Sequence, residues 1–363
     1  MKNHPTIARR SSRRDAARNS NHESRITEHE FKACLLTSAA TAFVFLLFTA
    51  AGVFAAPAPA LAESKSTVLL VVGAPGEEEF GKTFADSAAS WEKATRVAGA
   101  RPLTLGLKKV DGASDHDRLK QLLADEPKDG PLELWLVLIG HGTFDGKEAK
   151  FNLQGPDVTA TELAEWLKPF RRPVAVINCA SSSGPFLNKL SAAGRVVITS
   201  TRSGTEQNYA RFGEHFAAAI ANPEADLDKD GQTSLLEAFL FASSRVAEYY
   251  KTEGRLATEH PLLDDNGDGL GTPPDWFRGI RAVKRAKEGA SLDGLRAHQF
   301  HLVRSEQEQR MPADVRAKRD ELELEIERLR DSKAALGDAE YYAKLEPLLL
   351  SLARLYEPAK QKP

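Results

Sequence analysis

The chain has 363 residues, of which 42% are hydrophobic and 28% charged, and its formal net charge is −2. This composition is typical of a globular protein, and it excludes a mostly disordered chain, a collagen-like chain and a multi-span membrane protein. A charge this close to zero provides no basic field, so no nucleic-acid partner is expected. Two cysteines, Cys34 and Cys179, are too few for a disulfide scaffold.

The N-terminal residues 1–62 have the pattern of an export signal. Residues 1–32 carry eight Lys or Arg against four acids, and residues 33–62 carry no charge. Ala60-Leu61-Ala62 fits the small-x-small rule for signal cleavage. Alternatively, residues 33–56 are long enough to remain as an uncleaved membrane anchor. In both cases the basic flank stays inside, so we expect an exported domain, periplasmic or extracellular, whose only membrane contact is this segment.

Residues 67–200 alternate strand and helix signals. Strands are expected at 67–72, 102–107, 132–139, 174–178 and 196–200, and helices at 80–97, 115–123 and 159–167. Apolar runs without alternation are typical of strands that are buried on both faces of a parallel sheet. The segment therefore predicts an α/β fold, a doubly wound and mostly parallel sheet with helices on both faces.

Two strand ends carry side chains that are suited to catalysis. Gly140-His141-Gly142 closes the third predicted strand, and Cys179 follows Asn178 at the end of the next. Neighbouring strands lie about 4.8 Å apart, so the imidazole and the thiol are expected to face one cleft. A base beside a thiol is the arrangement that nucleophilic cysteine catalysis needs, with the backbone N–H groups of Gly142 and Cys179 as candidate oxyanion donors. The alternative is that Cys179 only fills apolar space.

These motifs resemble a known family. Gly140-His141-Gly142-Thr143, the run from Val176 to Gly184 and the strand and loop that follow resemble the legumain-like cysteine endopeptidases, relatives of caspases and gingipains, over residues 67–221. The resemblance implies a caspase-like fold and a Cys179/His141 dyad that hydrolyses peptide bonds through a thioester. A transpeptidase of the same chemistry and an inactive partner-binding module remain alternatives. Legumains place an Asn after the first strand, whereas this chain has Gly73-Ala74-Pro75-Gly76, which leaves the third site residue open.

The resemblance also locates a substrate pocket. The loop after residue 200 contains Glu206, and Gly213-Glu214-His215 matches the place of a family Gly-Asp-Trp turn. Either glutamate is a candidate for the pocket that receives the residue before the scissile bond. A carboxylate there favours Arg or Lys, with Asn as the competing choice. Arg202 and Arg211, in the same loop, are the alternative pocket residues.

Residues 226–237 match the twelve-residue EF-hand calcium loop. Glycine occupies position 6, and the candidate ligands are Asp226, Asp228, Asp230, Gln232 through its carbonyl, Ser234 and Glu237. A second, weaker match spans 264–275, with candidate ligands Asp264, Asn266, Asp268, Leu270 and Asp275. We expect Ca²⁺ in a structural role, although acidic Asp/Asn/Gly turns also form without a metal.

The chain therefore divides into the export segment 1–62, a peptidase domain at 63–305 and a tail at 306–363. Helices are expected at 312–335 and 339–356, separated by Gly337-Asp338. Two amphipathic helices joined by a short turn predict a helical hairpin. This hairpin either packs on the α/β domain or serves to bind a partner or a second copy.

Overall fold

The computed structural model describes residues 65–108, 112–287 and 290–356, all within the compact unit Pro59–Pro363. The export segment, with its candidate cleavage site and anchor, lies outside the described residues. In the part of the chain that is described, no helix is both long and apolar enough to span a membrane.

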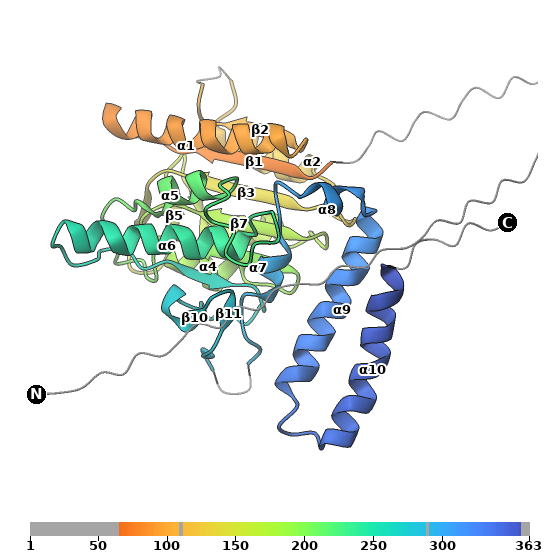
Figure 1. Ribbon diagram of the computed structural model, residues 1–363. Coiled ribbons are helices and arrows are strands. Elements are labelled where there is room, and N and C mark those ends of the chain that lie inside the picture. The colour runs from red at the N-terminus through yellow and green to blue at the C-terminus, as the bar shows by residue number, and fades with distance from the viewer. Residues whose placement is uncertain (1–64, 109–111, 288–289, 357–363) are drawn as a thin grey trace, which may run out of the picture. The chain divides into compact units, whose positions relative to one another are not determined.

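A six-stranded sheet forms the centre of this unit, in the order β2-β1-β3-β7-β8-β9 (Figure 1). Its strands are β1 (Thr67–Val72), β2 (Arg101–Leu105), β3 (Leu134–Ile139), β7 (Val174–Asn178), β8 (Arg195–Thr199) and β9 (Leu262–Asp264). The first five run parallel, and β9 pairs antiparallel with β8 at the edge. The expected doubly wound, mostly parallel sheet is confirmed.

Alternate side chains of each buried strand point to opposite sides of the sheet, and they are apolar on both sides. Both faces of the sheet are therefore covered by helices. One core contains residues of α1 (Glu78–Val97), α5 (Phe212–Ala219), α6 (Leu235–Thr252) and α7 (Leu295–Gln299). The other contains residues of α2 (Asp115–Asp125), α3 (Ala160–Leu167) and α4 (Gly184–Leu190). Trp91 stacks on Phe216 with ring centroids 5.9 Å apart, which ties α1 to α5.

Short elements that the sequence did not predict fill the connections. Between β3 and β7 lies a small antiparallel sheet, formed by β4 (Gly142–Phe144), β5 (Ala149–Phe151) and β6 (Val158–Thr159). After β9 come the 3-10 helix η1 (Pro274–Trp276) and the strand pair β10 (Phe277–Arg278) and β11 (Arg281–Ala282). The small sheet begins directly after His141, so it fixes the direction in which the chain leaves the candidate site.

The predicted helical hairpin is present. It follows α8 (Glu306–Arg310) and consists of α9 (Ala313–Asp331) and α10 (Asp338–Leu355), which lie side by side (Figure 1). Helix α9 ends at Asp331 rather than near Ala335, because its last carbonyls are closed by the N–H of Ser332. Arg319 pairs with Glu308 at 2.7 Å, which attaches α9 to the segment before it.

Candidate functional site

His141 and Cys179 lie at the same edge and on the same face of the central sheet. Strands β3 and β7 pair in parallel with Leu138 opposite Asn178. Cys179 follows Asn178, and its N–H continues the ladder by donating to the Leu138 carbonyl at 2.9 Å. His141 is two residues beyond Ile139, and Cys179 shares a core with Ile139 and Ile177. The register therefore directs both side chains to the face covered by α1 and α5.

His141 stands in an aromatic surround. The rings of Phe80 and Phe84, both on α1, lie 4.7 and 5.1 Å from the imidazole, and Tyr209 lies 6.0 Å away. Its Nε2 is 3.2 Å from the carbonyl oxygen of Pro75. In the tautomer protonated at Nε2, that nitrogen donates to Pro75 and leaves Nδ1 as the acceptor. Burial lowers the pKa of His141 below its ordinary value, against the opposing effects of the Pro75 carbonyl and Glu77.

Cys179 is buried, with 5% of its surface exposed. Burial raises the pKa of the thiol to about 12, and no other group offsets that effect. No hydrogen bond joins Cys179 to His141 in the described part of the chain. The thiol instead packs against Gly213 of α5, where a Cβ would lie 3.2 Å from Sγ. Both groups are therefore neutral near pH 7, so the resting site holds a thiol and an imidazole rather than an ion pair.

The two candidate oxyanion donors already have acceptors. The N–H of Gly142 donates to Ser181 Oγ at 3.3 Å, and that hydroxyl donates back to the Gly142 carbonyl at 3.1 Å. The N–H of Cys179 is held by Leu138. Next to Ser181, Ser182 adopts φ 54°, a left-handed conformation that non-glycine residues seldom occupy. Binding of an oxyanion at Gly142 would require its N–H to leave Ser181.

The two candidate pocket glutamates have different surroundings. Glu214, in the first turn of α5, accepts a hydrogen bond from the Tyr209 hydroxyl at 2.7 Å. Because Tyr209 also contacts His141, this places Glu214 one side chain away from the dyad. Glu206 is bound to His260 Nδ1 at 2.6 Å and to Arg202 Nε at 3.2 Å. Its carboxylate therefore braces the loop.

The two alternative pocket arginines also have partners. Arg202 is the exposed member of the pair with Glu206. The Arg211 guanidinium lies 4.3 Å from the ring centroid of Tyr249. Arg211 also lies over Tyr209, with its guanidinium 5.6 Å from that ring centroid, so Arg211 and Glu214 are both one side chain away from His141. Glu214 is the one of the two that is hydrogen-bonded to Tyr209.

The first calcium-like loop brings three of its four acids together, and Asp230 lies outside this group. Among the described residues, Asp226, Asp228 and Glu237 form the one group of three such side chains whose ligand atoms all lie within 4.8 Å of one another. Glu237 is fully buried and accepts from the N–H groups of Leu227 and Ser234. Burial, Glu237 and Asp230 raise the pKa of Asp228. Close acids that disfavour each other's charge, with oxygens as donors, fit a divalent cation such as Ca²⁺.

The remaining loop residues are arranged around this group. Ser234 caps α6, Asp230 accepts the Gln232 N–H at 3.0 Å, and His298 Nε2 lies 3.3 Å from Asp228. His298 is a contact that the loop motif does not predict.

The second calcium-like loop repeats the hydrogen bonds of the first from Asp264 to Leu270 and differs from it at Asp275. Asp264 accepts from the N–H groups of Gly267 and Gly269, and Asp268 accepts from that of Leu270. Asp275 is exposed on η1, where Pro273-Pro274 has redirected the chain. Asp264, Asp268 and Asp275 therefore do not form a group within the described residues. Asn266 Oδ1 accepts from the N–H of Asp268, as Asp228 does from that of Asp230 in the first loop, and its amide donates to the Ser291 carbonyl at 2.9 Å.

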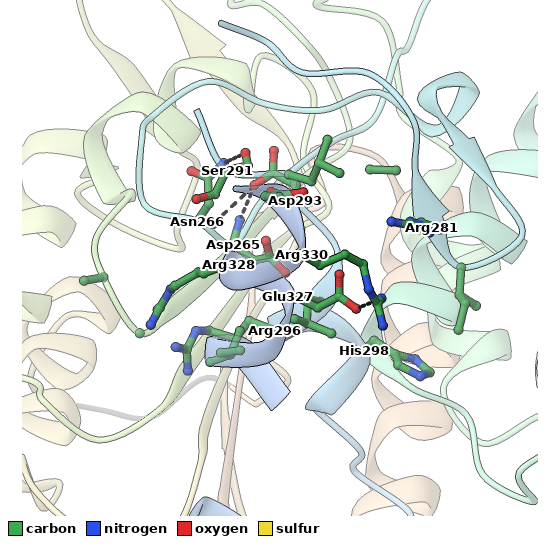
Figure 2. A pocket seen from close by; sticks show the side chains of 18 residues that line it. Asp265, Asn266, Arg281, Ser291, Asp293, Arg296, His298, Glu327, Arg328 and Arg330 are labelled. Carbon is green, nitrogen blue, oxygen red and sulfur yellow. Dashed lines mark hydrogen bonds and ion pairs between the residues drawn. The ribbon is translucent and has the colours of Figure 1, made fainter. Parts of the chain in front are cut away.

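A separate cavity of about 380 Å³ lies between α9, the β10–β11 pair and residues 291–296 (Figure 2). Its wall mixes acids and arginines, and Figure 2 shows Glu327 and Arg330 paired with each other. Asp265 and Asp293, on the opposite wall, are occupied by backbone N–H groups. Neither His141 nor Cys179 lines this cavity, so it belongs to the junction with the hairpin.

Three groups at the site escaped the sequence analysis: the Pro75 carbonyl, Tyr209 and Glu259. The Pro75 carbonyl follows β1 and lies 3.2 Å from His141 Nε2. Tyr209 lies within the predicted loop, and an aromatic residue four positions before the Gly213-Glu214 turn was an available signal. Glu259 accepts from the N–H groups of Arg211 and Phe212, across 47 or more residues of sequence, and no local pattern indicates it.

The solved structures that resemble this chain include two caspases, each a partial match. The Drosophila initiator caspase Dronc is 13% identical with a TM-score of 0.35, covering 55% of this chain and 79% of that one. Caspase-1 from Spodoptera frugiperda is 10% identical with a TM-score of 0.34, covering 55% of this chain and 85% of that one. No family model and no curated protein matches the chain.

Proposed function

We propose that this chain is a cysteine endopeptidase of the legumain-like type, with Cys179 as nucleophile and His141 as general base. The observation that carries the proposal is the pairing register, which directs both side chains from neighbouring parallel strands to one face at the carboxyl edge of the sheet. The contact between His141 and Pro75 supports it, because it leaves the other ring nitrogen as an acceptor.

The chemistry follows from these positions. His141 takes the thiol proton while Cys179 Sγ attacks the peptide carbonyl, and the tetrahedral oxyanion is stabilised by the Gly142 N–H, which exchanges Ser181 Oγ for it. Collapse of this intermediate breaks the C–N bond, and His141 returns the proton to the leaving amine. Water, deprotonated by the same imidazole, then hydrolyses the thioester and regenerates the thiol. An added amine in place of water gives the transpeptidase reaction.

Glu214 is the proposed specificity residue. Its half-buried carboxylate has one protein partner, the Tyr209 hydroxyl, so it retains acceptor capacity for a substrate side chain. A cationic substrate side chain would pair with the Glu214 carboxylate and offset the cost of its partial burial. This favours cleavage after Arg or Lys over cleavage after Asn. Glu206 is assigned to bracing the same loop.

Calcium is proposed as a structural ligand of the loop 226–237. Asp226, Asp228, Asp230, Ser234 and Glu237 would provide side-chain oxygens, and Gln232 its carbonyl. The cation would balance four acids and so hold the start of α6, which packs on α5 beside Cys179. The test is a calorimetric melt of the full chain with calcium and with a chelator.

One observation favours a second candidate function, a catalytically silent module that binds a partner. The Cys179 thiol is buried, and its raised pKa keeps it protonated. The outer face of α10 exposes Tyr342, Leu349 and Leu350, which would then serve partner binding. Incubation with a peptide library at several calcium concentrations distinguishes the two functions, because cleavage that is lost in Cys179→Ala supports the peptidase and absence of cleavage supports the module.

A further inference from the structure

The dipeptide Glu259-His260 holds the loop that borders Cys179. This loop, residues 200–211, connects β8 to α5 and contains Glu206. His260 contacts Glu206 twice, through Nδ1 at 2.6 Å and through its backbone N–H at 3.2 Å. Glu259 contacts the other end of the loop, at Arg211 and Phe212. Two consecutive residues from a distant segment therefore fix the loop in the middle and at its end.

Glu259 replaces the cap that α5 lacks. Arg211 stands at the N-cap position of α5 and makes no side-chain cap bond. The Glu259 carboxylate, 2% exposed, accepts the N–H of Arg211 at 3.0 Å and that of Phe212 at 2.9 Å. Tyr250, near the end of α6, donates its hydroxyl to the same carboxylate at 3.2 Å. Charge-assisted bonds of this kind satisfy N–H groups that a helix start otherwise leaves without partners.

The first turn of α5 is in turn packed on the nucleophile. Gly213 directly follows Phe212, and a Cβ there would lie 2.6 Å from the Cβ of Cys179. No space separates the helix start from the thiol, so a shift of the first turn changes the exposure of Cys179. The same shift moves Glu214, the next residue.

We propose that Glu259 is a positioning residue of this site, and that Glu259 and His260 together act as a clamp that sets the pocket loop and the α5 start against Cys179. The inference rests on the proposed function for its catalytic meaning. The clamp itself controls the exposure of the Cys179 thiol, and this exposure can be measured without any peptidase activity.

The test is Glu259→Gln in a Cys34→Ala background of the full chain, with Glu253→Gln as the matched control. Gln places an N–H₂ group where one backbone N–H needs an acceptor, whereas Glu253 is exposed at the end of α6. The rate of Cys179 alkylation by iodoacetamide should rise about tenfold in Glu259→Gln, the rate equivalent of one lost charge-assisted hydrogen bond, and stay unchanged in Glu253→Gln. Equal rates in the two variants would overturn the proposal.

A general loss of stability is separated from a clamp by two further comparisons. Val246→Ala removes a buried contact of α6 and serves as a control in which the melting temperature falls while the clamp stays intact. Its alkylation rate, measured well below the melting temperature, should stay near that of the parent chain. A rise equal to that of Glu259→Gln would show that lost stability explains the effect, and would overturn the clamp.

Peptide cleavage gives the second comparison. In Glu259→Gln, KM should rise more than kcat falls, whereas a smaller folded fraction lowers the apparent kcat and leaves KM unchanged. If Glu259→Gln does not fold, Tyr250→Phe tests the clamp in its place. It removes the one hydroxyl that donates to Glu259, and it should raise the rate of Cys179 alkylation by a smaller factor. A chain without peptidase activity whose alkylation rates still follow this order would refute the proposed function and leave the clamp standing.

Discussion

The substitution Gly213→Ala perturbs the nucleophile at its closest contact. The new Cβ would lie 2.6 Å from the Cys179 Cβ and 3.2 Å from Sγ, and neither Cβ can rotate out of the way. Carbon atoms pack best at about 3.5–4.0 Å, so Cys179 or α5 must shift by about 1 Å. A displacement of that size at a reacting group costs about 100-fold in rate. The predicted result is therefore a fall of about 100-fold in kcat/KM.

Stability should change much less than activity. Overpacking costs about 1–3 kcal/mol, and replacing glycine by alanine within a helix returns up to about 1 kcal/mol. The matched control is Gly81→Ala in α1, where a Cβ would make an ordinary contact at 3.5 Å with Pro75. That variant should keep its kcat/KM and gain slightly in stability. Peptide-cleavage kinetics and calorimetry measure both effects, and a Gly213→Ala enzyme with full kcat/KM would refute the placement of Cys179 against α5.

Three further predictions follow from the electrostatics of the site and its surroundings. With a thiol pKa of about 12, the thiolate fraction of Cys179 at pH 7.5 is about 10³-fold below that of an ordinary thiol. Alkylation of Cys179 should therefore be slow at neutral pH, and its rate should rise about tenfold per pH unit between pH 7 and 10. An alkylation rate that does not change with pH would contradict the raised pKa. Calcium at about 10⁻³ M should raise the melting temperature, and a chelator should lower it. This response should be weaker in Glu237→Gln and unchanged in Glu253→Gln, which alters an exposed residue. A melting temperature that does not depend on calcium would refute the proposed calcium site. Glu214→Gln should lower kcat/KM by more than tenfold for substrates with Arg or Lys before the scissile bond and spare those with Asn, whereas a preference for Asp would exclude a carboxylate-lined pocket.

The sheet could be predicted because its strands are continuous apolar runs. Residues 67–72, 134–139 and 174–178 are buried along their whole length, which is the property that the sequence displays. The helix from Ala160 was also predictable, since Thr159 and Glu162 form the capping box that begins it. Strands β4 to β6 were missed because runs of two or three residues show no periodicity.

The candidate site was predictable only where a side chain carries the signal. His141 and Cys179 follow recognisable strands, so their shared edge follows from topology alone. The group that contacts His141 is a backbone carbonyl, that of Pro75, and any residue type supplies one. Glu259 acts over 47 or more residues of sequence, and its contact depends on how β9 approaches α5. In the second calcium-like loop the sequence spacing does not locate the twelfth residue, because Pro273-Pro274 places Asp275 on η1.

The most direct test of the central claim is cleavage of a peptide library, with products identified by mass spectrometry, by the full chain, Cys179→Ala and His141→Ala in the presence of calcium. The proposed dyad predicts internal cleavage by the parent chain and none above background by either variant, with melting temperatures close to that of the parent. Cleavage that persists unchanged in Cys179→Ala would contradict the assignment of the nucleophile and, with it, the proposed function.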